Sequence, residues 1–205
     1  MSTLRVGLVG SRFAARLHAL AYRRVYGVTA RVVGVTSPTA ERREALARES
    51  GATAYASLAA MLPHVDVVDV CAPPAAHEPL ALEALEAGKH VLIEKPFTGA
   101  FGDGAGPGNR ASKARLLADA LASADRIVRA ARRRGVVLGY AENWIHAPAV
   151  QKEREIVEKT GAQILWMLGG ESHSGSHSPV YGIWRHAGGG SLVGKGCHPL
   201  TADAP

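Results

Sequence analysis

Cysteine is scarce in this chain of 205 residues, where Cys71 and Cys197 are the only two. They are too few for a disulfide framework, and neither belongs to a Cys-x-x-Cys pair of the kind that holds zinc or exchanges disulfides. Long hydrophobic runs are absent as well: no apolar stretch reaches transmembrane length, and the start MSTLRVGLVGSRF lacks the apolar region of a signal peptide. We therefore expect no membrane partner and a reducing, cytoplasmic location.

Aromatic residues make up only 5% of the sequence, and acidic residues are outnumbered, which gives a formal net charge of +6. A basic chain favours anionic partners such as nucleic acid, acidic lipid or a phosphate-bearing small molecule. Nucleic-acid grooves usually combine basic residues with stacking aromatics. The run Arg132 to Arg134 has no such aromatics, and it lies at the predicted end of a helix, where cations favour the dipole. We expect no nucleic-acid partner; salt-sensitive binding to DNA or RNA would show the opposite.

Hydrophobic residues make up 47% of the sequence, which is enough for a packed core. Short apolar runs alternate with helical patterns, and this alternation predicts parallel strands joined by right-handed crossovers. The strands show little period-two patterning, as in a sheet that is covered on both faces. The expected fold is α/β, a doubly wound parallel sheet of the Rossmann type. Strands are expected at 4–9, 31–35, around 53, 65–71, 90–93 and 136–140, and helices at 14–26, 39–49, 58–62 and 75–87.

A glycine-dense stretch at residues 98–112 interrupts the pattern and predicts a surface loop. A long helix should follow and end at Gly135. Beyond it we expect a helix at 147–159 and a strand at 163–168. We place a domain boundary near residue 141, with a dinucleotide-binding domain at 1–141 and an incomplete α+β domain at 142–205. The apolar face predicted for the long helix consists of Leu117, Leu121, Ala124, Val128 and Ala131.

The stretch GLVGSRFAA joins the first strand to the first helix. A phosphate-binding turn needs glycine where the backbone bends and small residues where the next helix approaches, so that amides point at the anion. Gly10 suits the bend and Ala15 the packing. The middle glycine of a G-x-G-x-x-G/A pattern is replaced by Arg12, which could neutralise a phosphate or block it. An ordinary strand-to-helix turn is the alternative reading.

The end of the second strand, GVTSPTAERR, lacks the acidic residue that usually holds the ribose diol of NAD. Thr36 and Ser37 occupy that position, and Arg42 and Arg43 follow. Small hydroxyls with arginine suit a 2′-phosphate, which favours NADP slightly over NAD. Alternatively, both arginines lie on a solvated helix face.

The apolar strand HVLI runs directly into Glu94, Lys95 and Pro96. Ligands of parallel sheets bind beyond the carboxyl ends of the strands, so Glu94 and Lys95 should project into such a site. A lysine there can hydrogen-bond to a substrate oxygen, and partial burial eases movement of its proton. The alternative is a surface lysine beside a turn.

The stretch VDVVDVCAPPAAHEPLALEALEAGKHVLIEKP combines an apolar strand, a proline pair, a histidine, a helix ending AGKHV and EKP in that order. This combination resembles the Gfo/Idh/MocA oxidoreductase family, enzymes of the glucose-fructose oxidoreductase and inositol 2-dehydrogenase type. The resemblance extends from residue 4 to about residue 200. Such proteins normally carry a full second domain, so we expect the chain to be a fragment or a truncated relative, and a full-length relative to be a homo-oligomer.

The resemblance implies roles for particular residues. Lys95 matches the catalytic lysine, and GGGSLVGKGCH resembles the family segment GGG-x-L-x-D-x-G-x-H, which makes His198 the catalytic histidine. Gly194 stands where that segment has aspartate. Asn143 is a candidate substrate contact, beside Lys95 and His198. The implied cofactor-binding residues are Gly10, Ser11, Arg12, Phe13, Ala14, Thr36, Ser37, Arg42, Ala72, Pro73, Pro74, His77, Glu94, Lys95, Pro96, Trp184 and Arg185.

These roles imply an NAD(P)-dependent oxidoreductase that acts on a hydroxyl or carbonyl group of a sugar, cyclitol or related polyol. Ala72 and Pro74 depart from the family's T-P-N-x-x-H segment, which removes two side-chain hydrogen bonds. The alternative function is a catalytically inactive nucleotide-binding module. His173 and His177 are four apart, but the glycine and proline around them disfavour a helix, so we expect no metal site.

Overall fold

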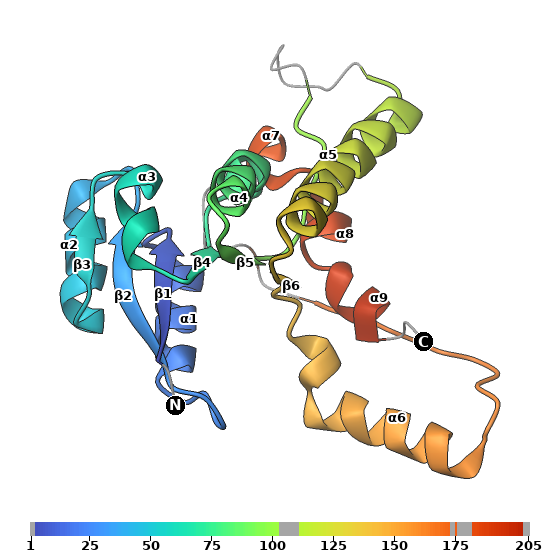
Figure 1. The fold of residues 1–205 in the computed structure, drawn as a ribbon. Helices are drawn as coiled ribbons and strands as arrows, with labels where there is room; N and C mark the ends of the chain where they lie inside the picture. The colour runs from blue at the N-terminus through green and yellow to red at the C-terminus, as the bar shows by residue number, and fades with distance from the viewer. Residues whose placement is uncertain (1–2, 103–110, 173–174, 176–181, 203–205) are drawn as a thin grey trace.

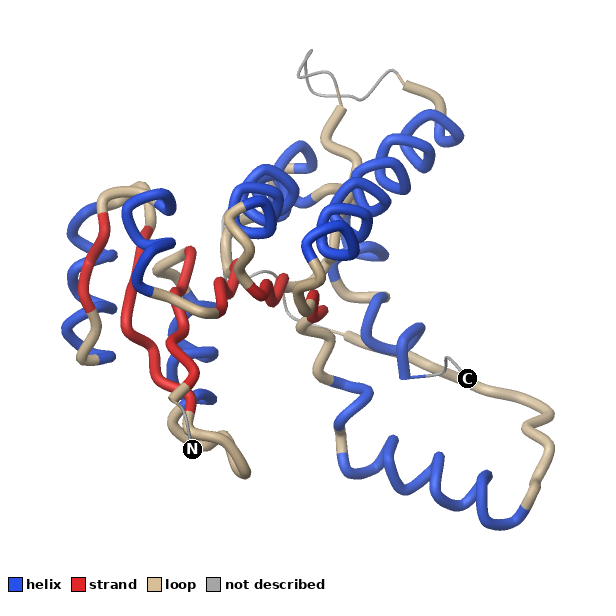
Figure 2. Tube along the Cα trace, in the orientation of Figure 1, coloured by secondary structure: helices blue, strands red, loops and turns tan. Residues whose placement is uncertain are grey.

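The structure is a computed structural model that describes residues 3–102, 111–172, 175 and 182–202. Its centre is a six-stranded sheet in the order β3-β2-β1-β4-β5-β6 (Figures 1 and 2), and every strand pair is parallel. All carboxyl ends therefore lie at one edge. This order is that of the doubly wound Rossmann fold, and it confirms the predicted fold class. The strands are β1 (Leu4–Val9), β2 (Ala30–Thr36), β3 (Thr53–Tyr55), β4 (Val67–Val70), β5 (His90–Ile93) and β6 (Leu138–Tyr140).

Helices cover both faces of the sheet because alternate strand residues point to opposite sides. Val6 and Leu8 of β1 pack against α1 (Phe13–Tyr22) and α2 (Ala40–Ser50), whereas Val9 points to the other face. That second face carries α3 (Leu58–Met61), the 3-10 turns η1 (Leu62–His64) and η2 (Pro74–Ala76), α4 (His77–Glu86) and α5 (Lys113–Arg134).

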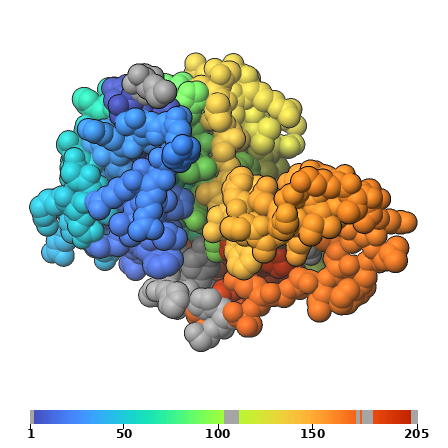
Figure 3. Space-filling model, turned by 90° about the horizontal axis from the view of Figure 1, so that it is seen from below, coloured from blue at the N-terminus to red at the C-terminus, as the bar shows by residue number. Residues whose placement is uncertain are grey.

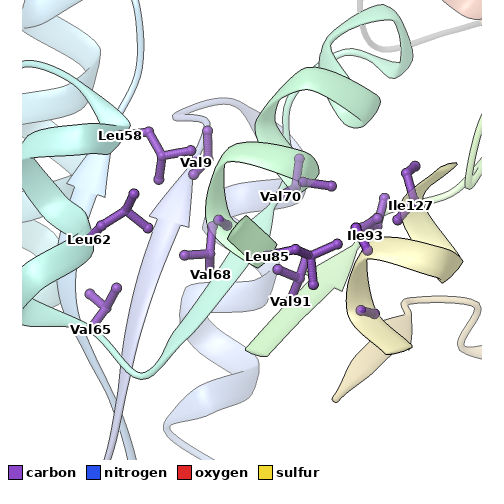
Figure 4. Close-up of a cluster of buried hydrophobic side chains, with 14 of the residues drawn as sticks. Val9, Leu58, Leu62, Val65, Val68, Val70, Leu85, Val91, Ile93 and Ile127 are labelled. Carbon is purple, nitrogen blue, oxygen red and sulfur yellow. The ribbon is translucent and has the colours of Figure 1, made fainter. Parts of the chain in front are cut away.

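The larger of the two cores lies on the second face. Its members are mostly Val, Leu and Ile from neighbouring strands and helices (Figure 4), and Val68, Leu85 and Ile127 are fully buried. Each such side chain contributes about 1.5–3 kcal/mol when it leaves water. The strands that carry it end at the edge where the candidate site lies.

The apolar face predicted for α5 is wrong in part. Leu117 and Leu121 are about 60% exposed, and the residues that α5 buries are Ser123, Ile127, Ala130 and Ala131. The small buried residues of α5 let this helix approach α4 closely. Arg126 of α5 pairs with Glu78 of α4, and Arg134 pairs with Glu86. The contact with α4 therefore determines which face of α5 is buried, and the positions of the largest apolar side chains of α5 do not. Gly135 ends the helix in the left-handed conformation, as predicted.

Beyond β6 the chain forms η3 (Trp144–His146), α6 (Pro148–Thr160), α7 (Trp184–Ala187), α8 (Gly190–Gly194) and α9 (Cys197–Ala202). α6 and the residues directly after it, coloured orange, stand out to one side of the molecule as a lobe (Figure 3). The strand predicted at 163–168 is wrong: residues 161–172 form neither helix nor strand. A strand needs a hydrogen-bonded neighbour, and within the described part of the chain the sheet ends at β6.

The predicted boundary near residue 141 falls just after β6 and remains a prediction. None of the helices in the described part of the chain combines the length and the apolar character that a bilayer crossing requires.

Candidate functional site at the carboxyl edge of the sheet

The turn after β1 is built around Gly10. Its φ of +133° is one that side chains rarely adopt, and a Cβ there would lie 2.7 Å from the carbonyl oxygen of Cys71. α1 begins three residues later, and its N-cap Arg12 makes no side-chain cap. The first amides of a helix lack partners within the helix, so this turn can cradle an anion. Arg12 is exposed, as is Phe13, while Ala14 is half-buried.

The turns after β1 and β2 are joined by a hydrogen bond between two buried hydroxyls, since Ser11 Oγ lies 2.8 Å from Ser37 Oγ. Arg43 Nη1 donates to the carbonyl oxygen of Ser37 over 2.9 Å, and Arg42 donates to the hydroxyl of Thr39. Thr36 is buried at the strand end. The predicted pair Thr36 and Ser37 therefore lies beside the Gly10 turn, with Arg42 exposed at its rim.

His77 ties the loop after β4 to the loop after β5. Its Nε2 lies 2.9 Å from the carbonyl oxygen of Ala72, and its Nδ1 lies 3.0 Å from that of Pro96. Burial lowers the pKa of His77 in spite of these bonds, so the ring is neutral and donates one hydrogen at a time. The ring thus fixes Ala72, the exposed Pro73 and the buried Pro74 relative to the strand that carries Lys95.

Glu94 takes part in a buried charge network that the sequence analysis missed. His18 of α1 lies between two carboxylates, with Nδ1 2.8 Å from Asp69 and Nε2 3.3 Å from Glu94. Burial lowers the pKa of His18, but the hydrogen bonds and charges of the two carboxylates outweigh it and raise the pKa to about 10. The ring is therefore an imidazolium at neutral pH.

Asp69 is fully buried in the middle of β4 and receives further hydrogen bonds from Tyr22, at 3.0 Å, and from the thiol of Cys71, at 3.3 Å. Burial and the charge of Asp69 raise the pKa of both donors, which keeps them protonated. A carboxylate inside an otherwise apolar strand needs such partners. That carboxylate is a sequence signal that buried partners exist, although it does not say which residues they are.

Lys95 stands at the end of β5 and is partly buried. Its Nζ donates to the carbonyl oxygen of Gly194, 99 residues away in the sequence, over 2.9 Å. The peptide bond between Lys95 and Pro96 is cis. The contact brings α8 and the segment that carries His198 to the carboxyl end of the sheet.

His198 is buried, and its Nδ1 lies 2.7 Å from Oε1 of Glu142, which is 1% exposed. Glu142 follows β6, and it also accepts a hydrogen bond from the amide of Trp144 over 3.0 Å. Sequence reasoning missed Glu142, although a carboxylate just beyond a strand end was a signal for it. Burial and the charge of Glu142 raise the pKa of the neighbouring Cys197 thiol.

Three predicted site residues lie at the margin of the site that contains Lys95 and His198. Asn143 and Arg185 are exposed, and Trp184 is 38% exposed on α7. α7 packs against η2, beside the loop after β4. The structure therefore brings Gly10, Ser37, His77, Glu94, Lys95 and His198 to one edge and leaves those three at its margin.

Two sets of potential metal ligands occur among the described residues: His18, Asp69 and Cys71, and Glu142, Cys197 and His198. His173 and His177 lie outside the described residues. A hollow of about 440 Å³ lies along α6. None of the predicted site residues lines this hollow, so the candidate site at the sheet edge is described by the contacts between its side chains.

Comparison with known proteins shows which family this chain resembles. Residues 4–113 match the sequence model of the Gfo/Idh/MocA oxidoreductase family, NAD-binding Rossmann fold. The chain is 37% identical over 98 residues, 48% of its own length and 30% of the relative's, to UDP-N-acetylglucosamine 3-dehydrogenase of Acidithiobacillus ferrooxidans. It is 30% identical over 208 residues, 98% of its length and 53% of the relative's, to D-glucoside 3-dehydrogenase of Escherichia coli.

Among solved structures, GenD2 from gentamicin A biosynthesis, in complex with NAD, superposes with a TM-score of 0.78 at 25% identity. The alignment covers 98% of this chain and 53% of that chain. The chain thus spans about half, or less, of the length of these relatives.

Proposed function

The chain belongs to the Gfo/Idh/MocA family of oxidoreductases, and from this premise we propose that it is an NAD(P)-dependent dehydrogenase or reductase. Its substrate is a hydroxyl or carbonyl group of a sugar, cyclitol or related polyol. The observation that carries the proposal is the convergence of Lys95 and the segment around His198 at the carboxyl edge, beside a turn that fits a dinucleotide.

The fit of the cofactor rests on Gly10. A side chain at this position would fill the space where the backbone turns against Cys71, and the uncapped first amides of α1 suit a diphosphate. Ser37 directly follows β2, Arg42 lies near the start of α2, and neither Thr36 nor Ser37 is the acidic residue that would hold a ribose diol at the strand end. These features favour NADP over NAD.

The chemistry divides between cofactor and protein, and the bound nicotinamide supplies the hydride acceptor or donor. Lys95 holds and polarises the substrate oxygen with its ammonium group. His198 takes the proton of a hydroxyl group in oxidation and returns it in reduction. Glu94 is the neighbour of Lys95 in the sequence, and its carboxylate is paired with His18.

The substrate class is inferred from the relatives, two of which are named as 3-dehydrogenases of a nucleotide sugar and of a D-glucoside. We therefore place a pyranose first among the candidates. A homo-oligomer and a cytoplasmic location are parts of the same proposal.

Replacing Lys95 with Met tests the proposed role, because the change keeps the length of the side chain and removes its charge. We expect turnover of a responsive sugar to fall about 10²–10⁴-fold, with the Kd for the nucleotide little changed. The measurements are nicotinamide absorbance with a panel of glucosides, nucleotide sugars and inositols, and calorimetric titration of the nucleotide.

Lys152→Met is the matched control, because Lys152 is an exposed lysine on α6. It should leave both quantities unchanged. Turnover by Lys95→Met at the wild-type rate would refute the role of this lysine.

A further inference from the structure

We propose that Glu142 is the residue that positions His198 for proton transfer, so that a glutamate from the end of β6 serves the histidine of α9. The inference rests on the proposed function. It starts from the 2.7 Å contact between Oε1 of Glu142 and Nδ1 of His198, two residues 56 apart in the sequence.

The contact fixes the state of the imidazole ring. A carboxylate only accepts hydrogen bonds, so the hydrogen between the two groups belongs to Nδ1 of His198. In the neutral ring Nε2 then carries the lone pair, and it is the nitrogen that can take a proton from a hydroxyl. When it does, the ring becomes an imidazolium beside Glu142, and the negative charge of the carboxylate stabilises it.

The carboxylate is itself held in place. The amide of Trp144 donates to the same oxygen over 3.0 Å, and the indole ring of Trp144 lies 5.9 Å from the imidazole ring, centroid to centroid. Glu142 therefore cannot turn away without losing two hydrogen bonds.

Burial argues for a role beyond packing. Glu142 is 1% exposed, and its second oxygen, Oε2, is buried without a hydrogen-bond partner in the part of the chain that the structure describes. An apolar side chain would fill this space at lower cost, because a buried carboxylate loses its hydration. A charge kept here is instead useful to a neighbouring histidine whose own charge changes during turnover.

Gly194 makes this pairing more important. It stands where the resembling family segment has an aspartate, four residues before His198, and it offers only its carbonyl oxygen, which accepts from Lys95. The two sides of the site thus have separate anchors: backbone for Lys95 and the Glu142 carboxylate for His198.

The test compares Glu142→Met, which removes the acceptor at similar length, with Glu142→Gln, which keeps an acceptor and removes the charge. Ring ¹⁵N spectra of His198, assigned with His198→Asn, report which nitrogen carries the hydrogen. Samples contain a chelator, because Glu142, Cys197 and His198 place three potential metal ligands within 4.8 Å of one another. Glu153→Gln, an exposed glutamate on α6, is the matched control.

We expect hydrogen on Nδ1 in the wild type, the Glu153→Gln control and Glu142→Gln, and a shift towards Nε2 in Glu142→Met. Turnover should fall about 10²-fold in Glu142→Met and less in Glu142→Gln, with KM and nucleotide affinity nearly unchanged. A purely structural glutamate would instead change the melting temperature and leave the tautomer as it was.

Identical ring spectra in wild type and Glu142→Met, or equal turnover, would overturn the inference. A wild-type chain without turnover on any sugar would count against the proposed function. The ring spectra of the same samples would still decide whether Glu142 holds His198.

Discussion

His18 shows how much of the candidate site depends on single buried side chains. It lies between Asp69 of β4 and Glu94, which directly follows the neighbouring strand β5, and its side chain is 15% exposed. Asp69 is 51 residues away from His18 in the sequence, and Glu94 is farther still. No local sequence pattern therefore predicts that these residues are in contact. Glu94 was predicted from the end of its strand, whereas the cation that neutralises it could be found only from the fold.

Replacing His18 with Leu should destabilise the chain in a pH-dependent way. The folded-state pKa of about 10 lies above the ordinary 6.5, so the contribution of His18 to stability is complete below the ordinary value and disappears as the pH rises through about 10. We expect a loss of about 3–5 kcal/mol in the free energy of unfolding at about pH 6, just below the ordinary pKa of histidine, because two carboxylates are left without their cation. Urea denaturation of both proteins at several pH values measures the difference.

His146→Leu is the control, because His146 is an exposed histidine on η3. Groups that do not interact with His18 titrate equally in wild type and variant and cancel in the difference. A His18→Leu difference that stays constant from neutral pH to beyond the folded pKa would contradict the assigned charge.

The strands and most helices were predictable because their signals are local. Short runs rich in apolar and β-branched residues, bounded by turn or charged residues, indicated all six strands, and Gly51 and Gly135 ended two helices in the left-handed conformation. The buried side of α5 was not predictable in this way. It depends on the contact with α4, where small residues allow close approach.

Two substitutions on α5 test that contact. Ile127→Ala should lower the free energy of unfolding by about 2–5 kcal/mol, because Ile127 is fully buried in the larger core. Leu121→Ala should change it by less than about 0.5 kcal/mol, because Leu121 is 59% exposed. Equal losses in the two variants, measured by urea denaturation, would mean that α5 is turned differently.

The strand expected at 163–168 failed for a related reason. Its run of apolar residues from Ile164 to Leu168 is real, and Leu165, Trp166 and Leu168 are 76–86% exposed in the structure. A strand depends on a neighbour as much as on its own sequence. Where the described chain supplies no partner, pattern alone does not make a strand.

The whole molecule assembles its candidate site from distant parts of the chain. Turns after β1, β2, β4 and β5 form one side, and α8 and α9 form the other through Lys95 and Glu142. The topological rule that ligands bind beyond the carboxyl ends of parallel strands made the first side predictable. The second side was expected from a resemblance, and the pairing of Glu142 with His198 was identified from the contacts in the structure.

Calorimetric titration of the wild type and of Gly10→Val with NADP and with NAD shows whether a nicotinamide dinucleotide binds over the Gly10 turn. The account predicts saturable binding to the wild type, tighter for NADP, and loss of binding in Gly10→Val, whose side chain would meet the Cys71 carbonyl. Circular dichroism of the variant shows whether it remains folded. No binding of either nucleotide to the wild type, or equal binding to a folded Gly10→Val, would contradict the account.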